Sequence, residues 1–328
     1  MQLSKKRWKG LLKLLGPFLF ILFFIHVVDP WKVLALLKKI RIELVLISML
    51  LFPVIPAVLS YRWWIVCSRL KMDASLKSLY QTYYASWFIG SIPLSGVAAL
   101  SKIIYLKKEG ESVKTTVVSL TLDKLFDILG LMIFGLLGLF YFSGKLIEGK
   151  ILWTVYGGIV LVIFMLMLLG RKTWEILKRL INRYTTNKIV KLGYGLGEDL
   201  KHFWDCFTLK LFFLITALSI GTELLRSLIL YILAISLDIY VPFVLIVACS
   251  ALIGIANIVP ITISGLGTRE AILLLALPLG GVSKEAAMAL GFTAFLWTIC
   301  YKFSGVVFWI KRPLPSVEIN AIKEKLFP

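Results

Sequence analysis

The segment that decides the fold spans residues 209–237 and reads LKLFFLITALSIGTELLRSLILYILAISL. It is apolar along nearly its whole length, and its interior contains only two ionisable residues, Glu223 and Arg226. A helix needs about 20 consecutive, mostly apolar residues to cross the hydrocarbon core of a bilayer. The segment therefore predicts a transmembrane helix.

Four further apolar runs lie at residues 14–28, 44–59, 125–142 and 151–169. Hydrophobic residues make up 59% of the 328-residue chain and charged residues only 17%, whereas soluble proteins contain about 45–50% apolar residues. The mean hydropathy is +0.89. We therefore predict an all-α fold, a polytopic bundle of transmembrane helices in the cell membrane.

The formal net charge of +19 does not indicate a nucleic-acid-binding protein. Basic residues gather at the ends of apolar runs, as at residues 5–7 and 171–172, which is the pattern of loops at an anionic membrane face. No soluble stretch is long enough for a nucleic-acid-binding domain. The four cysteines and two histidines lack metal-ligand spacing, so we expect no metal, no cofactor and no nucleic acid partner.

The basic loops predict the orientation in the membrane. Residues 171–210 contain nine lysine or arginine residues against four acidic ones, so this loop should be cytoplasmic, and both termini with it. We expect a single membrane domain over residues 1–312, with a cytoplasmic amphipathic loop at about 171–208 and a short cytoplasmic tail at 313–328. Residues 29–41 fit less well because four basic residues fall on the outer side; their apolar spacing predicts an interfacial helix.

Two apolar stretches, residues 83–106 and 244–279, are interrupted near their centres by proline and glycine. The interrupting residues are Pro93, Gly96, Pro260, Gly265 and Gly267. Proline breaks a helix, and broken backbone at membrane depth is tolerated only where it is buried in protein or lines a wet cavity. If both stretches are re-entrant hairpins that enter from opposite faces, about six full spans remain, giving eight or more membrane helices. The alternative is two kinked spans in each stretch, with about eight to ten helices in all.

Ionisable residues at membrane depth cost roughly 2.5–3.5 kcal/mol each on insertion scales and usually face the interior of the bundle. Asp123 and Asp127 are four residues apart and share one helix face, from which Lys124 is turned by about 100°. Glu223 and Arg226 are three residues apart and can pair directly.

Three more charged residues follow the two breaks. Lys102 follows the first break, and Arg269 with Glu270 follows the second, where they could cap the start of a helix. The cations could hold a lipid phosphate together with backbone N–H groups at the broken helix ends. The acidic residues would balance them, or accept a headgroup amine or a proton. The alternative is that all of these groups form structural salt bridges and cytoplasmic helix ends.

The predicted substrate-binding residues thus lie at the two breaks and on the charged helices. They are Pro93, Gly96, Lys102, Asp123, Lys124, Asp127, Glu223, Arg226, Asn257, Pro260, Gly265, Gly267, Arg269 and Glu270. We expect no catalytic residues.

These residues lie in two motifs. The first contains residues 90–96 (GSIPLSG), Lys102 and residues 122–127 (LDKLFD). The second contains residues 257–260 (NIVP) and 264–270 (SGLGTRE). In order and separation they resemble the two motif regions of the lysylphosphatidylglycerol synthase transmembrane region family, and the resemblance extends over nearly the whole chain.

The resemblance implies a flippase-like membrane domain that moves a phospholipid or lipid-linked headgroup between leaflets. The family often has Glu-Arg where this chain has Asp123 and Lys124, and arginine near Lys102. These departures conserve charge, but lysine cannot grip a phosphate bidentately as arginine does. The family's soluble aminoacyl-transferase domain is missing from the sequence, so we expect no synthase activity and no enzyme.

The expected partners are membrane lipids with an anionic or lipid-linked headgroup, and a homo-oligomer or an envelope-synthesis enzyme is a further candidate. Two other functions stay open. One is a membrane-embedded transferase acting on lipid-linked sugars, although no loop contains an Asp-x-Asp pair or a histidine-rich cluster. The other is a non-transporting scaffold or regulator of envelope lipid synthesis.

Overall fold

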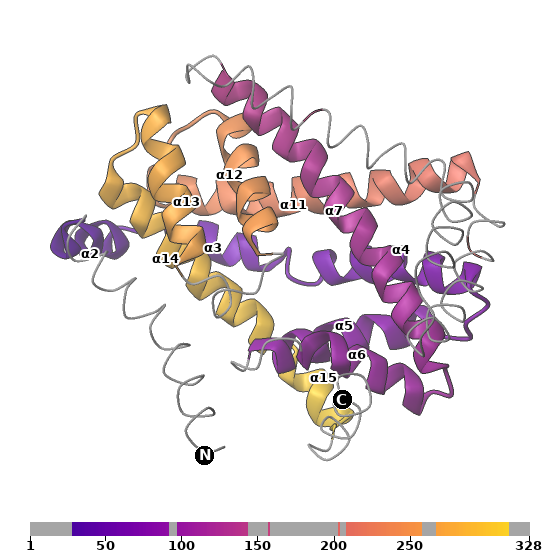
Figure 1. Ribbon diagram of the computed structural model, residues 1–328. Coiled ribbons are helices and arrows are strands. Elements are labelled where there is room, and N and C mark those ends of the chain that lie inside the picture. The colour runs from indigo at the N-terminus through magenta and orange to yellow at the C-terminus, as the bar shows by residue number, and fades with distance from the viewer. Residues whose placement is uncertain are drawn as a thin grey trace, which may run out of the picture. The chain divides into compact units, whose positions relative to one another are not determined.

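The computed structural model describes residues 28–91, 97–143, 157, 203, 208–257 and 267–314. Within these residues all regular secondary structure is helical (Figure 1). The helices are α2 (Pro30–Lys38), α3 (Ile42–Met49), α4 (Val54–Arg69), α5 (Leu76–Ser91), α6 (Val97–Lys108), α7 (Val113–Ser143), α11 (Leu209–Ser236), α12 (Phe243–Ala256), α13 (Thr268–Ala276), the 3₁₀ helix η1 (Leu277–Gly280), α14 (Lys284–Phe303) and α15 (Val306–Lys311). The all-α prediction is confirmed for the described part of the chain.

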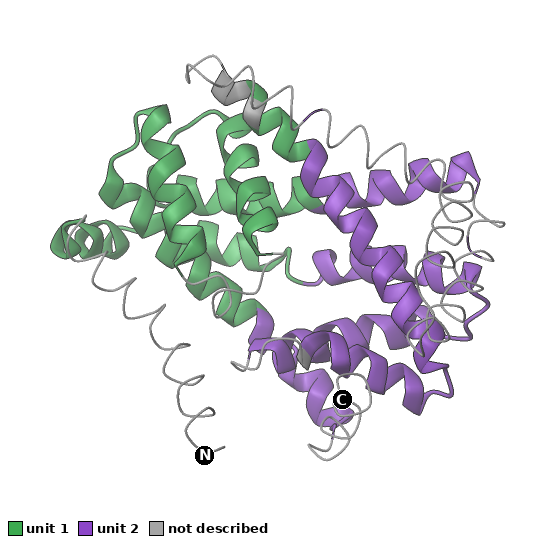
Figure 2. Cartoon of the chain, in the orientation of Figure 1, with its two compact units in different colours: residues 1–52, 134–150, 223–301 green, residues 53–133, 151–222, 302–328 purple. Residues whose placement is uncertain are grey.

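The chain divides into two compact units (Figure 2). Unit 1 comprises residues 1–52, 134–150 and 223–301, and unit 2 comprises residues 53–133, 151–222 and 302–328. The two units are interleaved along the sequence, and the single domain over residues 1–312 stays a prediction. Each unit contains one of the two interrupted stretches, the first in unit 2 and the second in unit 1.

Three helical segments among the described residues are long and apolar enough to cross a membrane. They are Ile42–Arg69, Leu209–Ser236 and Lys284–Lys311, and Phe243–Ala256 is a shorter apolar helix. The span predicted at residues 209–237 is therefore confirmed to within one residue. The total of about six spans and two hairpins stays a prediction.

Several predicted segments fall largely or wholly outside the described residues. They are the spans at 14–28 and 151–169, the amphipathic loop at 171–208 and the tail at 313–328.

The predicted run at residues 44–59 is not one uninterrupted helix. Helix α3 ends at Met49 and α4 begins at Val54, with a turn between them. Pro53 is the N-cap of α4. Proline lacks the N–H that an interior helical position would donate, so a helix restarts readily after it. Helix α4 then extends to Arg69, well beyond the predicted end of the run.

The first interrupted stretch forms a helix pair in unit 2. Helix α6 folds back along α5, and the two share a buried core (Figure 1). Its buried members are Ala85 and Ile89 from α5, and Leu100, Ile103, Ile104 and Tyr105 from α6, with Leu314. The predicted break therefore separates two packed helices, although residues 92–96 lie outside the description.

The second interrupted stretch behaves in the same way within unit 1. Helix α12 ends before Asn257, and α13 begins at Thr268 and packs against α12. Residues 258–266 between them lie outside the description.

The interfacial segment at residues 29–41 contains the predicted helix. Asp29 caps α2, and its Oδ1 accepts hydrogen bonds from the backbone N–H groups of Trp31 at 2.9 Å and Lys32 at 3.4 Å. Val33 is buried while Trp31 is 79% exposed. An apolar inner face and an exposed tryptophan are typical of a helix that lies at a membrane surface.

Candidate functional site

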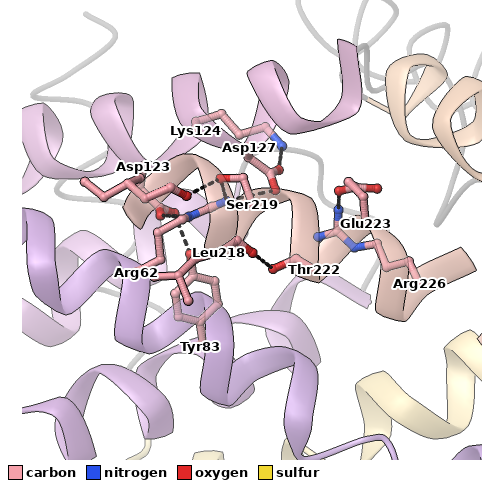
Figure 3. Close-up of polar contacts among 11 residues, drawn as sticks. Arg62, Tyr83, Asp123, Lys124, Asp127, Leu218, Ser219, Thr222, Glu223 and Arg226 are labelled. Carbon is pink, nitrogen blue, oxygen red and sulfur yellow. Dashed lines mark hydrogen bonds and ion pairs between the residues drawn. The ribbon is translucent and has the colours of Figure 1, made fainter. Parts of the chain in front are cut away.

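A buried arginine on α4 organises the charged residues of unit 2 (Figure 3). The Arg62 side chain is 1% exposed. Its Nε donates to Asp123 Oδ1 at 2.8 Å, and its Nη1 donates to Ser219 Oγ at 2.9 Å. The same Nη1 lies 3.5 Å from Asp127 Oδ1. One guanidinium thus joins α4 to both predicted carboxylates of α7 and to α11.

Both oxygens of Asp123 are engaged. The Tyr83 hydroxyl donates to Asp123 Oδ2 at 2.6 Å, opposite the bond from Arg62 (Figure 3). Asp123 is 5% exposed, so these contacts replace the water that it would otherwise bind.

Helices α7 and α11 approach closely enough for this arrangement because Gly130 faces Ser219. A Cβ added at Gly130 would lie 3.0 Å from the Ser219 Cβ. The Ser219 hydroxyl in turn donates to the Ile215 carbonyl oxygen at 3.0 Å. A serine on α11 can therefore accept from Arg62 while its own proton stays bonded within the helix.

We predicted that Lys124 turns away from the carboxylates, but its ammonium group reaches Asp127. Its Nζ lies 2.8 Å from Asp127 Oδ2, although the Lys124 side chain is 55% exposed. Residues three apart on a helix are neighbours, and the long lysine side chain spans the angle between the two positions. The rotation of about 100° between neighbouring helical positions sets where the Cβ atoms lie. It does not limit how far the lysine ammonium group can reach.

Lys102 lies on aromatic rings. Its Nζ is 3.3 Å from the centroid of the Tyr83 ring and 5.2 Å from that of Trp63. The two rings meet edge to face, with centroids 5.4 Å apart. Trp63 is fully buried, and its Nε1–H donates to Ser119 Oγ at 3.0 Å, which fixes the orientation of the indole.

The predicted pair on α11 is confirmed in unit 1. Arg226 Nη1 donates to Glu223 Oε1 (Figure 3). Glu223 is 1% exposed, whereas the Arg226 side chain is 31% exposed. The pair therefore presents its cationic member outward.

The start of α13 forms a third group, also in unit 1. Gly267 has φ +92°, a backbone conformation that residues other than glycine rarely adopt. Its N–H donates to Glu270 Oε2 at 2.6 Å. This confirms the predicted cap by Glu270. Within the described part of the chain, two buried atoms here have no hydrogen-bond partner, Arg269 Nη1 and Glu270 Oε1. Unpaired buried polar groups are costly, and Arg269 Nη1 is therefore a ready donor for an anion.

The structure thus groups the predicted residues as follows. Lys102, Asp123, Lys124 and Asp127 come together in unit 2, whereas Glu223 with Arg226 and Gly267 with Arg269 and Glu270 form two groups in unit 1. Asn257 is the exposed C-cap residue of α12. Pro93, Gly96, Pro260 and Gly265 lie outside the described residues.

Sequence reasoning missed Arg62 and its neighbours Tyr83, Trp63 and Ser219. The predicted run ended at residue 59, so Arg62 was placed beyond the membrane helix. A signal was present, because residues 63–67 (WWIVC) after Arg62 are as apolar as those before it. An arginine with apolar sequence on both sides indicates a buried charge with a partner.

No cluster of metal-ligand residues occurs among the described residues.

Comparison with protein families shows which family the chain resembles over most of its length. The family described as lysylphosphatidylglycerol synthase TM region matches residues 10–302 of the chain. The matched range includes every predicted site residue and Arg62. A comparison with curated proteins gives no match.

Proposed function

This chain belongs to the lysylphosphatidylglycerol synthase TM region family, and we propose that it moves a phospholipid or a lipid-linked headgroup between the leaflets of the cell membrane. The family supports a membrane domain that handles lipids. The finer assignment to translocation rests mainly on the buried network around Arg62.

That network is costly in a protein that only needs to reside in a bilayer. Ionisable side chains at membrane depth are unfavourable by several kcal/mol and commonly mark a path for polar cargo. Here Arg62, Asp123 and Asp127 are all at least 93% buried. A headgroup crossing the hydrocarbon needs such groups to replace its water.

The residues divide by charge into two roles. In unit 2, Lys102 would contact a headgroup phosphate, and the carboxylates at 123 and 127 would balance it or accept a headgroup amine. In unit 1, Arg226 and Arg269 would have the first role and the carboxylates at 223 and 270 the second. Arg62 would act as a positioning residue, because its guanidinium holds Asp123 and Asp127 in place.

The two helix–break–helix pairs suit alternating access. Interrupted helices in corresponding halves commonly flank the site of a transporter, and here each unit contains one pair. Movement of each broken element would expose the charged residues of its own unit to one leaflet and then to the other. On this proposal the protein is not an enzyme and needs no cofactor. Both termini lie in the cytoplasm, and a second copy or an envelope-synthesis enzyme could be a partner.

Arg269 is the residue to test, because its buried Nη1 has no hydrogen-bond partner among the described residues and can donate to an anion. In proteoliposomes containing a fluorescent phospholipid, Arg269→Met should slow transbilayer movement at least about tenfold, equivalent to about 1.4 kcal/mol. The matched control is Lys107→Met, an exposed lysine near the end of α6, which should transport as the unaltered protein does.

Equal rates for Arg269→Met and the unaltered protein would remove Arg269 from the transport path. Metal-dependent turnover of a nucleotide sugar, without lipid movement, would favour the transferase. Co-purification with a synthase, again without lipid movement, would favour the scaffold.

A further inference from the structure

Among the described residues around Arg62, Lys102 differs from Arg62 and Lys124 in having no carboxylate partner. Arg62 Nε and Tyr83 engage the two oxygens of Asp123, and Lys124 Nζ is the nearest cation to Asp127, at 2.8 Å. Within the part of the chain that the structure describes, Lys102 forms no ion pair. Its ammonium lies instead on the faces of Tyr83 and Trp63.

The charges of this cluster do not cancel. Among the described residues of this cluster, Arg62, Lys102 and Lys124 are basic, and only Asp123 and Asp127 are acidic. Arg62 with Asp123 and Lys124 with Asp127 form two close pairs, so Lys102 is the basic residue left without a carboxylate. Lys102 is partly buried, and a cation–π contact offsets only part of the cost of taking an uncompensated ammonium out of water.

We propose that Lys102 is the receptor for a single negative charge, the phosphodiester of a net-anionic phospholipid. This inference rests on the proposed function for the lipid source of the phosphate. The Tyr83 and Trp63 rings hold the ammonium while the site is empty. When the phosphate arrives, the ammonium pairs with it and the cluster becomes neutral.

Each neighbour has a defined part in this site. The hydrogen bond from Tyr83 to Asp123 and that from Trp63 to Ser119 fix the two rings, so the aromatic surface is preformed. Lysine suits the role because its ammonium is a compact charge on a flexible stem. Since the excess charge is one, a net-anionic headgroup is favoured over a zwitterionic one, whose own ammonium would restore the excess.

The test is calorimetric binding to the full chain in a non-ionic detergent. The probes are short-chain phosphatidylglycerol, short-chain phosphatidylcholine and inorganic phosphate. The unaltered protein should bind phosphatidylglycerol about tenfold more tightly than either other probe, a difference of about 1.4 kcal/mol. Lys102→Met should abolish that preference, and Lys102→Arg should keep it. Lys107→Met, five residues along the same helix and exposed, should bind as the unaltered protein does.

Equal binding of phosphatidylglycerol and phosphatidylcholine by the unaltered protein would overturn the inference, even if Lys102→Met failed to fold. An unchanged preference in folded Lys102→Met would also overturn it. Inorganic phosphate binding as tightly as phosphatidylglycerol would overturn the assignment to a lipid. Binding that depends on Lys102 in a protein that moves no lipid would overturn the proposed function and leave this site standing.

Discussion

At the residue scale, the guanidinium of Arg62 fixes how its neighbours are oriented. Its Nε contacts Asp123 and its Nη1 contacts Asp127 and Ser219, and the side chain is 1% exposed. In a buried ion pair, the loss of one partner is far more costly than the loss of both, because the remaining charge is left without compensation.

We predict that Arg62→Met lowers the free energy of unfolding by about 3–5 kcal/mol, because Asp123 and Asp127 lose their shared cation. Unfolding in mixed SDS micelles would measure the change. The control Arg69→Met, on the same helix but exposed, should cost no more than about 1 kcal/mol. The triple change Arg62→Met, Asp123→Asn and Asp127→Asn should lose less than Arg62→Met alone. A loss no larger than that of Arg69→Met would contradict the prediction.

The sequence predicted half of this network. The spacing of Asp123 and Asp127 correctly placed both carboxylates on one helix face, and both reach Arg62. Arg62 itself was missed because its partner Asp123 lies 61 residues away in the chain. Local periodicity cannot pair residues on different helices. The pair at 223 and 226 was found because both partners lie within one helical turn, and the cap by Glu270 was expected because this residue directly follows the second break.

At the scale of elements, two close approaches depend on glycine. In unit 1 a Cβ at Gly291 of α14 would lie 2.9 Å from the Glu270 Cγ and 3.4 Å from its Cα. Glu270 is the fully buried residue that caps α13. The position of the Glu270 cap therefore depends on residue 291 of α14 being a glycine, which leaves room for the Glu270 side chain.

We predict that Gly291→Ala destabilises the protein by about 1–3 kcal/mol, because the added methyl displaces Glu270 from Gly267. Gly221→Ala is the matched control, since Gly221 is also inside a helix but has open space around it. That change should stabilise the protein by about 0.5–1 kcal/mol. Thermal unfolding of both variants in detergent measures the difference, and the same shift in both would contradict this packing.

The second close approach joins α15 to α5 in unit 2. Gly305 lies against the Tyr84 carbonyl oxygen, and Phe308 stacks on the Tyr84 ring with centroids 5.1 Å apart. Arg312 then reaches α6, where its guanidinium contacts Glu109 just after the helix and lies over the Tyr105 ring. The segment after residue 302 thus braces the helix pair that contains Lys102.

We predict that Gly305→Ala loosens α15 from α5, because the methyl would overlap the Tyr84 backbone. Amide hydrogen exchange should become faster in Leu76–Ser91 and Val306–Lys311. Val307→Ala, a change at a 51% exposed position of α15, serves as the control and should leave exchange in α5 unchanged. Equal exchange in the two variants would refute the bracing role.

Hydropathy predicted helix positions better than helix ends. The apolar run at 125–142 lies within α7, but the helix begins twelve residues earlier, at Val113. That first part is polar, and its side chains have partners in other helices: Ser119 accepts from Trp63, and Asp123 from Arg62. A hydropathy profile registers such residues as unfavourable because it cannot include partners on distant parts of the chain.

At the scale of the whole molecule, composition predicted the membrane class, and the breaks predicted the two helix pairs. Each compact unit contains one helix–break–helix pair, with one group of buried charges in unit 2 and two in unit 1. The division into units could not be read from the sequence, because both units are assembled from three separate segments. Both units belong to one polypeptide, so the proposed lipid movement is tested on the full chain.

The most direct measurement is the rate at which fluorescent phosphatidylglycerol changes leaflet in proteoliposomes of the full chain, compared with protein-free vesicles of the same lipids. We predict movement in the proteoliposomes at least about tenfold faster, a barrier lower by about 1.4 kcal/mol. Equal rates in both kinds of vesicle, for anionic, zwitterionic and polyprenyl-linked lipids alike, would contradict translocation as the function of this protein.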